Sequence, residues 1–217
     1  MKMIVSENEV YQIVKKSCVS EKIYEDWADD IGKAIAFLQK NNMDGCEEFK
    51  NLIYVPVSKD YITIKQERNL LTVEDLNPIQ NAIPIIDWLI SGQNKKIIVT
   101  SQIISPLIFF SLLAKTCENY GGTFKISNEK KEILHEITAN FEFLKIDKLK
   151  GYFIIEWFKS KKFINPNNSK KHLHSVKLHS VKKETWEYLS QKAYSTYVPE
   201  TTVSRNSGAG AGLLDND

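Results

Sequence analysis

The sequence predicts an α+β fold, in which a helical N-terminal hairpin packs on a mixed β-sheet that includes one βαβ unit, followed by a glycine-rich C-terminal segment. Three observations support this prediction: helical periodicity in the first part of the chain, a strand–helix–strand pattern over residues 97–126, and alternating apolar residues from Phe141 onward. We expect residues 1–200 to form a single α+β domain. Residues 201–217 are expected to be ordered against that domain or against a partner subunit.

The composition is that of an ordinary globular protein. The 217 residues are 42% hydrophobic and 26% charged, and the net charge of +2 gives no global field for binding nucleic acid. Lysines are concentrated in residues 159–183, but without the arginines and interleaved aromatic residues of a nucleic-acid surface. The sequence therefore argues against a nucleic-acid partner.

The cysteines and the N-terminus bear on the cellular compartment. Cys18, Cys46 and Cys117 are isolated and odd in number, so neither a disulfide framework nor a zinc site is indicated. The first residues contain no apolar signal core, and the apolar stretches are too short to span a bilayer. We therefore expect a cytoplasmic protein with no membrane partner.

The N-terminal hairpin is predicted from capping signals and periodicity. Ser6 and Glu9 form a capping box for a first helix. Ser20 is expected to begin a second helix, because apolar residues recur at intervals of three and four from Ile23 to Leu38. A short third helix is expected over residues 47–54.

Residues 55–90 give mixed signals. Residues 61–64 resemble a strand, and Thr72 with Asp75 resembles a turn or a helix cap. Residues 79–90 are apolar enough for a buried helix, although Pro84 would limit or kink it.

The βαβ unit is the clearest pattern in the chain. A β-branched run at residues 97–100 precedes a helix that Ser105 and Pro106 open, and residues 123–126 form the next strand. Such strands are expected to be parallel, with a right-handed crossover. The helix N-terminus near Ser105 could receive a small anion, but no GxGxxG or GxxxxGK[ST] motif indicates a dinucleotide site.

The remaining chain is predicted to contain strands and one helix. Residues 141–145 and 152–158 are expected to form a hairpin, and the sequence Leu-His-Ser-Val-Lys at residues 173–177 is repeated at 178–182. His172 and His174 would share a strand face, but no third ligand completes a metal site. A final helix is expected over residues 184–197.

The C-terminal segment carries the residues with the most suggestive chemistry. Alternating glycine and alanine at residues 208–212 can turn successive backbone amides toward one anion. Arg205 adds a forked cation, while Asp215 and Asp217 add acceptors. The alternative is a frayed tail, because small polar terminal segments are usually mobile.

The same segment resembles the terminal signature of an uncharacterised bacterial protein family. The resemblance rests on the strings TYVP, SR, GAGAG and DND within residues 193–217, and extends to residues 5–9 and to the helix from Gly32 to Leu38. The family has no established activity, so the resemblance implies a bacterial protein and a functional C-terminal segment, but it identifies neither a reaction nor a cofactor, and the cofactor stays unknown.

These observations lead to a protein of unknown function that binds a small molecule, an anionic metabolite, or acts on it as an enzyme. The candidate catalytic residues are Glu200, Arg205 and Asp215; the candidate ligand-binding residues are Tyr197, Ser204, Arg205, Gly208, Gly210, Gly212, Asn216 and Asp217. The alternative is a non-catalytic accessory protein whose C-terminal segment docks into a partner protein or a second copy of the chain.

Overall fold

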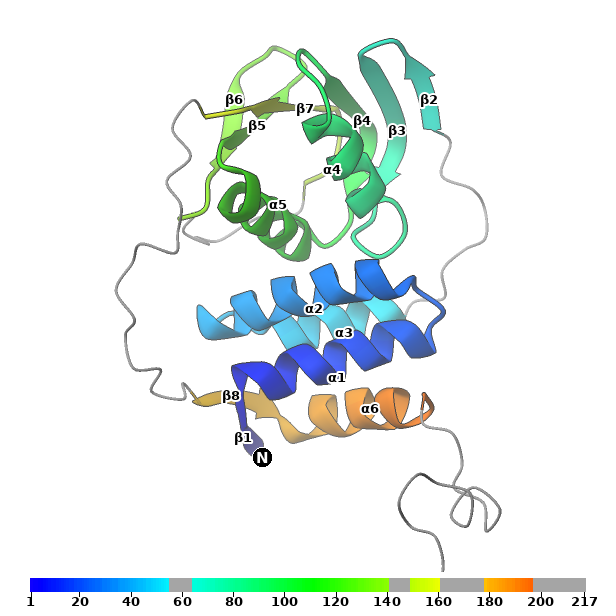
Figure 1. Ribbon diagram of the computed structural model, residues 1–217, viewed down its shortest axis with the longest axis vertical. Helices are drawn as coiled ribbons and strands as arrows, with labels where there is room; N and C mark the ends of the chain where they lie inside the picture. Colours follow the sequence, from blue (N-terminus) through cyan, green and yellow to red (C-terminus); the bar gives the residue numbers. More distant parts are fainter. Residues whose placement is uncertain (55–63, 141–148, 161–177, 197–217) are drawn as a thin grey trace, which may run out of the picture.

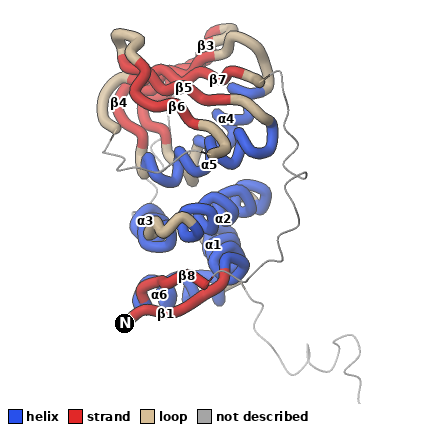
Figure 2. Tube along the Cα trace, turned by 90° about the vertical axis from the view of Figure 1, so that its left-hand side faces the viewer, coloured by secondary structure: helices blue, strands red, loops and turns tan. Residues whose placement is uncertain are grey.

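The computed structural model describes residues 1–54, 64–140, 149–160 and 178–196. The predicted α+β class is confirmed, because helices combine with a mixed sheet. The elements form layers: the sheet, then α4 (Ala82–Ile90) and α5 (Pro106–Tyr120), then the N-terminal helices, and finally a small unit of two strands and one helix (Figure 1). The view from the side shows the same order (Figure 2).

Within the described residues, the main sheet has six strands in the order β2-β3-β4-β7-β5-β6. Their bounds are β2 (Ile64–Glu67), β3 (Leu70–Leu76), β4 (Lys96–Ile103), β5 (Thr123–Asn128), β6 (Ile133–Ile137) and β7 (Phe153–Phe158). Only β3 and β4 pair in parallel, and the other neighbours are antiparallel. The sheet is therefore mixed, as predicted.

The predicted βαβ unit is present in a modified form. β4, α5 and β5 follow one another as expected, but β7 lies between the two strands and pairs antiparallel with each. β4 and β5 therefore run in the same direction without being neighbours. The adjacent parallel pair is β3 and β4, which α4 connects. The prediction of a turn or cap at Thr72 and Asp75 was wrong, since both residues lie within β3.

One face of the sheet is covered by α4 and α5, as Figure 1 shows. Alternation places Val73, Val99 and Ile155 in the core, as well as Phe124 and Ile126 of β5. On the opposite face, Lys96 of β4 and Glu156 of β7 form an ion pair of 2.8 Å. The buried face therefore provides the platform on which the helices are positioned.

The N-terminal helices are α1 (Glu7–Ser20), α2 (Glu25–Lys40) and α3 (Gly45–Tyr54). The capping box is confirmed, because the Ser6 amide donates to Glu9 Oε2 at 2.7 Å and the Glu9 amide donates to Ser6 Oγ at 3.2 Å. The prediction that Ser20 begins a helix was wrong. Ser20 ends α1, and α2 begins at Glu25 after a turn in which Lys22 has a φ of 63°.

A second, two-stranded sheet lies beside α1. It pairs β1 (Lys2–Ser6) antiparallel with β8 (Leu178–Lys182), which is the second copy of the repeated pentapeptide. The helix α6 (Lys183–Tyr194) follows and packs on α1, where Ser17 Oγ donates to the Leu189 carbonyl at 3.0 Å. The first copy of the repeat, the predicted strand at residues 141–145 and the end of the predicted helix at Tyr197 lie outside the described residues.

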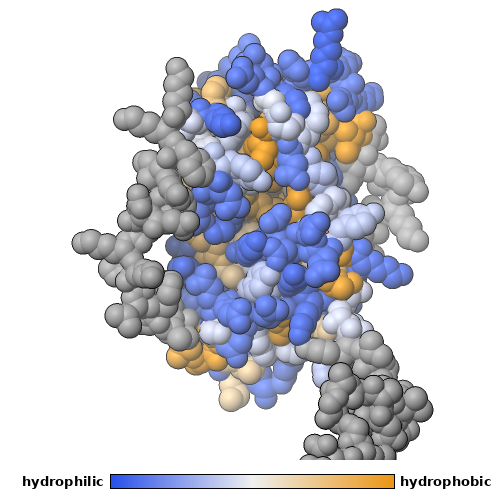
Figure 3. All heavy atoms as spheres, viewed as in Figure 1, coloured by the Kyte–Doolittle hydropathy of each residue, from blue (hydrophilic) through white to orange (hydrophobic). Residues whose placement is uncertain are grey.

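The layers share one continuous apolar core. The N-terminal hairpin contacts α5 rather than the sheet itself, and Ser111 Oγ of α5 donates to the Ala34 carbonyl of α2 at 2.8 Å. On the face in Figure 3, hydrophilic side chains cover most of the described surface, and apolar ones appear in smaller patches. None of the helices in the described ranges has both the length and the apolar character needed to cross a membrane.

Candidate functional site

The predicted C-terminal site lies outside the described residues. This holds for the catalytic candidates Glu200, Arg205 and Asp215, and for Tyr197, Ser204, Gly208, Gly210, Gly212, Asn216 and Asp217. These residues therefore remain predictions, and the site described below is built from other parts of the chain.

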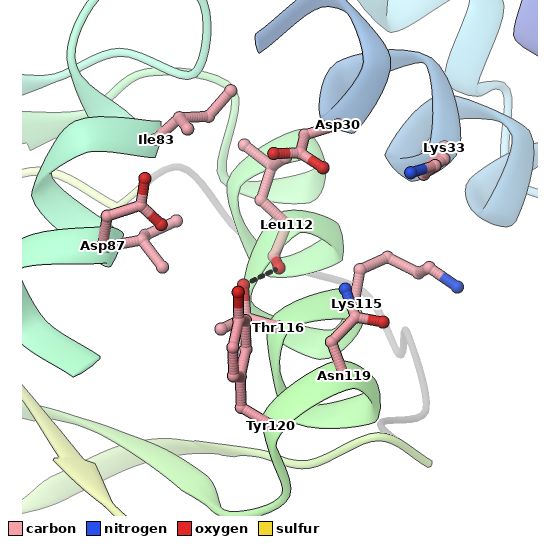
Figure 4. Close-up of a pocket in the computed structure, with 10 residues that line it drawn as sticks. Asp30, Lys33, Ile83, Asp87, Leu112, Lys115, Thr116, Asn119 and Tyr120 are labelled. Atoms are coloured by element: carbon pink, nitrogen blue, oxygen red, sulfur yellow. Dashed lines mark hydrogen bonds between the residues drawn. The ribbon is translucent and has the colours of Figure 1, made fainter. Parts of the chain in front are cut away.

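A pocket of about 260 Å³ lies where α2 meets α4 and α5, and we call it the interhelical pocket (Figure 4). Three apolar side chains and seven polar ones line it, and each of the three helices contributes. The lining residues are Asp30 and Lys33 of α2, Ile83, Ile86 and Asp87 of α4, and Leu112, Lys115, Thr116, Asn119 and Tyr120 of α5.

Helical spacing brings these residues to the pocket. On α5, Leu112, Thr116 and Tyr120 follow at intervals of four and therefore lie on one face. On α4, Ile83 and Asp87 have the same spacing, so the carboxylate projects beside a buried apolar side chain. The lining thus combines an apolar floor of buried side chains with a larger number of polar groups, so it suits a charged ligand better than a purely apolar one.

The two carboxylates of the pocket face an unusual environment. Asp30 and Asp87 lie on opposite sides of it, and neither side-chain carboxylate makes a hydrogen bond or ion pair with any other described residue (Figure 4). Desolvation raises the pKa of both carboxyl groups. Lys33 opposes this shift for Asp30, whereas the negative charges of Asp29 and Asp87 add to it.

The two lysines of the rim are already paired. Lys33 Nζ lies 2.5 Å from Asp29 Oδ2, and Lys115 forms an ion pair with Glu118. The Thr116 hydroxyl donates to the Leu112 carbonyl at 2.9 Å. The charges of the pocket that lack a partner in the described structure are therefore both negative, so the chemistry of the pocket favours a cation.

Other kinds of site receive no support from the described residues. In these parts of the chain, no group of three or more histidine, cysteine or acidic side chains is placed to hold a metal ion. Cys18, Cys46 and Cys117 are buried, and desolvation raises the pKa of the Cys46 and Cys117 thiols to about 12. At the N-terminus of α5, Ser105 Oγ donates to Glu48 Oε1 at 2.8 Å, so a carboxylate of the chain itself lies there.

Sequence reasoning missed the interhelical pocket. Asp30 sits on the polar side of a regular amphipathic helix, where an acidic residue is unremarkable. Asp87 offered a better signal, because it is the single charged residue in the apolar helix α4. A single carboxylate in an apolar helix indicates that its residue lies either near a helix end or at a polar site. In this structure, Asp87 lies at a pocket.

Comparisons with known proteins give one match. Residues 5–88 match a family described as "Protein of unknown function (DUF3726)", which is less than half of the chain. No curated protein and no solved structure is significantly similar to the chain. The matched region runs from β1 to α4 and includes Asp30 and Asp87, whereas α5 and the C-terminal segment lie beyond it. Over residues 5–88, the chain is thus similar to a family of proteins of unknown function.

Proposed function

We propose that this protein binds a small molecule in the interhelical pocket, and that a cationic amino group of the ligand lies between Asp30 and Asp87. The observation that carries the proposal is the pair of carboxylates on opposite sides of one pocket, both without a partner in the described structure. Both residues remain exposed to solvent, so their carboxylates are only partly desolvated; carboxyl groups with raised pKa values beside a pocket are nevertheless concentrated at functional sites.

An ammonium group complements the two carboxylates. Its N–H groups donate hydrogen bonds that both carboxylates can accept, and its positive charge favours their ionised forms. The apolar floor of Ile83, Ile86 and Leu112 suits the methylene groups next to the nitrogen. An alcohol of the same size would fill the pocket equally well but would leave both negative charges uncompensated.

The test compares n-butylamine with n-butanol by isothermal titration calorimetry. We expect the amine to bind and the alcohol not to. Asp30→Asn and Asp87→Asn should each weaken amine binding by roughly tenfold or more, since hydrogen bonds to charged groups contribute about 1.5–3 kcal/mol. Binding should also weaken as the pH falls through the raised pKa values of the two carboxyl groups, because the protonated acids no longer attract a cation.

Glu74→Gln is the matched control. Glu74 is an exposed carboxylate on β3 and does not line the pocket, so its replacement changes the net charge equally. Amine binding that is the same in Asp87→Asn as in the unaltered protein would refute the proposal.

The glycine-rich C-terminal segment remains a separate proposal, supported by the sequence. Arg205 stands next to the alternating glycines at residues 208–212, a combination suited to an anionic metabolite or to docking into a partner protein. Truncation after Val203 tests it. If the segment holds an anion, inorganic phosphate should raise the unfolding midpoint of the full chain and leave that of the truncated chain unchanged.

A further inference from the structure

We propose that the ligand is bipolar, with an oxyanion at the end opposite its amino group, and that this oxyanion binds in a hollow adjoining the interhelical pocket. The inference rests on the proposed amine site and extends it to the rest of the ligand. The interhelical pocket alone, at about 260 Å³, falls below the range of about 300–1,000 Å³ that is usual for ligand pockets. It suits the head group of a ligand, and the remainder requires a second space.

The structure provides that space between α1, α2 and α5. A hollow of about 600 Å³, which we call the lysine hollow, shares two of its residues, Lys33 and Lys115, with the interhelical pocket. The two spaces therefore adjoin. The residues that line the hollow are Glu7, Asn8, Tyr11, Lys33, Ala36, Phe37, Lys40, Lys115 and Glu118.

The two carboxylates that are unpaired in the described structure and the lysines lie in different parts of the combined site. Asp87 lies at one end on α4, and Lys33 and Lys115 lie on the side of the pocket remote from it (Figure 4). Lys40 lies farther along α2 and lines only the lysine hollow. A molecule extending from the interhelical pocket into the hollow thus passes from these two carboxylates to three lysines, each of which is paired with an acidic side chain, namely Asp29, Glu7 or Glu118.

The lysines differ in how easily a ligand can recruit them. Lys33 is held by Asp29, whose pKa its ammonium helps to lower. Lys40, in contrast, pairs with Glu7 at 3.3 Å, and the two side chains are 43% and 45% exposed. Exposed ion pairs of this kind contribute little to stability, so a carboxylate or phosphate of the ligand can replace Glu7 at small cost.

The middle of the site is suited to a hydrocarbon spacer. Phe37 and Ala36 present apolar surface in the lysine hollow, and Lys115 Nζ lies 5.6 Å from the centroid of the Phe37 ring. This contact keeps the Lys115 ammonium beside an apolar surface, close to the border of the two spaces. The geometry therefore matches an aliphatic chain with an amine at one end and an oxyanion at the other.

The test uses straight-chain ω-amino acids of increasing length, with n-alkylamines and n-alkanoates of the same lengths as one-ended controls. Affinities are measured by titration calorimetry on the full chain. We expect one ω-amino acid length to bind at least about tenfold tighter than the matching alkylamine, because the second end binds at a high effective concentration. A phosphonate in place of the carboxylate shows whether the hollow prefers a doubly charged oxyanion.

Variants separate the two ends of the site. Lys40→Gln should remove the advantage of the ω-amino acid and leave alkylamine binding unchanged, whereas Asp87→Asn should weaken both ligands. Lys65→Gln, on the exposed edge strand β2, is the control for loss of a positive charge. If no ω-amino acid binds tighter than its alkylamine, or if Lys40→Gln has no effect, the bipolar ligand is refuted while the amine site stands. If alkylamines do not bind at all, the proposed function itself fails.

Discussion

Replacement of Gly122 by alanine is expected to be severely destabilising for two reasons, backbone strain and a steric clash. A control substitution at a second glycine distinguishes the two contributions. Gly122 connects α5 to β5 and has a φ of +130°, which side chains rarely adopt. A Cβ atom there would lie 2.6 Å from the Phe158 carbonyl oxygen and 2.6 Å from Cη2 of Trp157. Neither atom is at the end of a flexible chain, since one is backbone and the other belongs to a ring packed 4.5 Å from Phe124.

The magnitude follows from adding the two effects. Holding a non-glycine residue in a sparsely populated backbone region costs about 1–3 kcal/mol. Forcing an additional carbon into packed surroundings costs typically about 1–3 kcal/mol more. We therefore expect Gly122→Ala to lower the free energy of unfolding by roughly 2–6 kcal/mol, a large part of the total for a marginally stable protein.

Gly151→Ala is the matched control. Gly151 also has a positive φ, +109°, but a Cβ atom there would meet nothing within 4 Å. It should therefore show the backbone cost alone. The assay is urea unfolding monitored by far-ultraviolet circular dichroism. The unfolding free energies of the two variants are compared if the dependence of free energy on urea concentration is the same for both. If Gly122→Ala costs no more than Gly151→Ala, the close approach of β7 to this turn does not constrain the fold, and the reasoning is wrong.

Two further predictions concern titration and reactivity. Lys33, Tyr11 and Lys15 lower the pKa of Asp29 from 3.8 to about 2, so Asp29 stabilises the folded protein above pH 3.8 and this contribution disappears as the pH falls toward 2. Asp29→Asn should therefore lower the unfolding free energy at neutral pH by roughly 2 kcal/mol, with a difference from the unaltered protein that vanishes in acid; a difference independent of pH would contradict this. The buried thiols of Cys18, Cys46 and Cys117 should resist iodoacetamide in the native protein, and mass spectrometry in a urea series should show them reacting over the same range in which helical signal is lost. Alkylation of any of them well below that range would indicate local opening.

The parts of the fold that sequence predicted well are those fixed by local chemistry. The capping box at Ser6 and the helix opened by Pro106 depend on neighbouring residues only. The prediction that a helix begins at Ser20 was wrong because the turn between α1 and α2 has no glycine or asparagine to indicate it. The residue at positive φ in this turn is a lysine, Lys22. The prediction of a turn or cap at Thr72 and Asp75 was wrong for another reason. Pairing with β2 and β4 makes a strand from residues that locally favour a turn.

The position of β7 and the candidate site could not be read from local patterns. Nothing near residues 97–126 indicates that a later strand inserts between β4 and β5. The interhelical pocket also depends on tertiary packing, because Asp30 and Asp87 belong to separate helices that only packing brings together. The two residues do not form a sequence motif with fixed spacing. The one local signal for the pocket was the isolated carboxylate of Asp87 in an apolar helix.

The layer formed by β1, α1, β8 and α6 has a consequence for biosynthesis. Its first two elements leave the ribosome early and its last two leave after the entire sheet has been made. While the chain is growing, the surface of α1 that later contacts Leu189 has no α6 to cover it. While the sheet is being translated, the nascent protein therefore exposes the apolar surface of α1 that α6 later covers. Covering this surface requires a contact between remote parts of the chain, which forms slowly compared with a local helix.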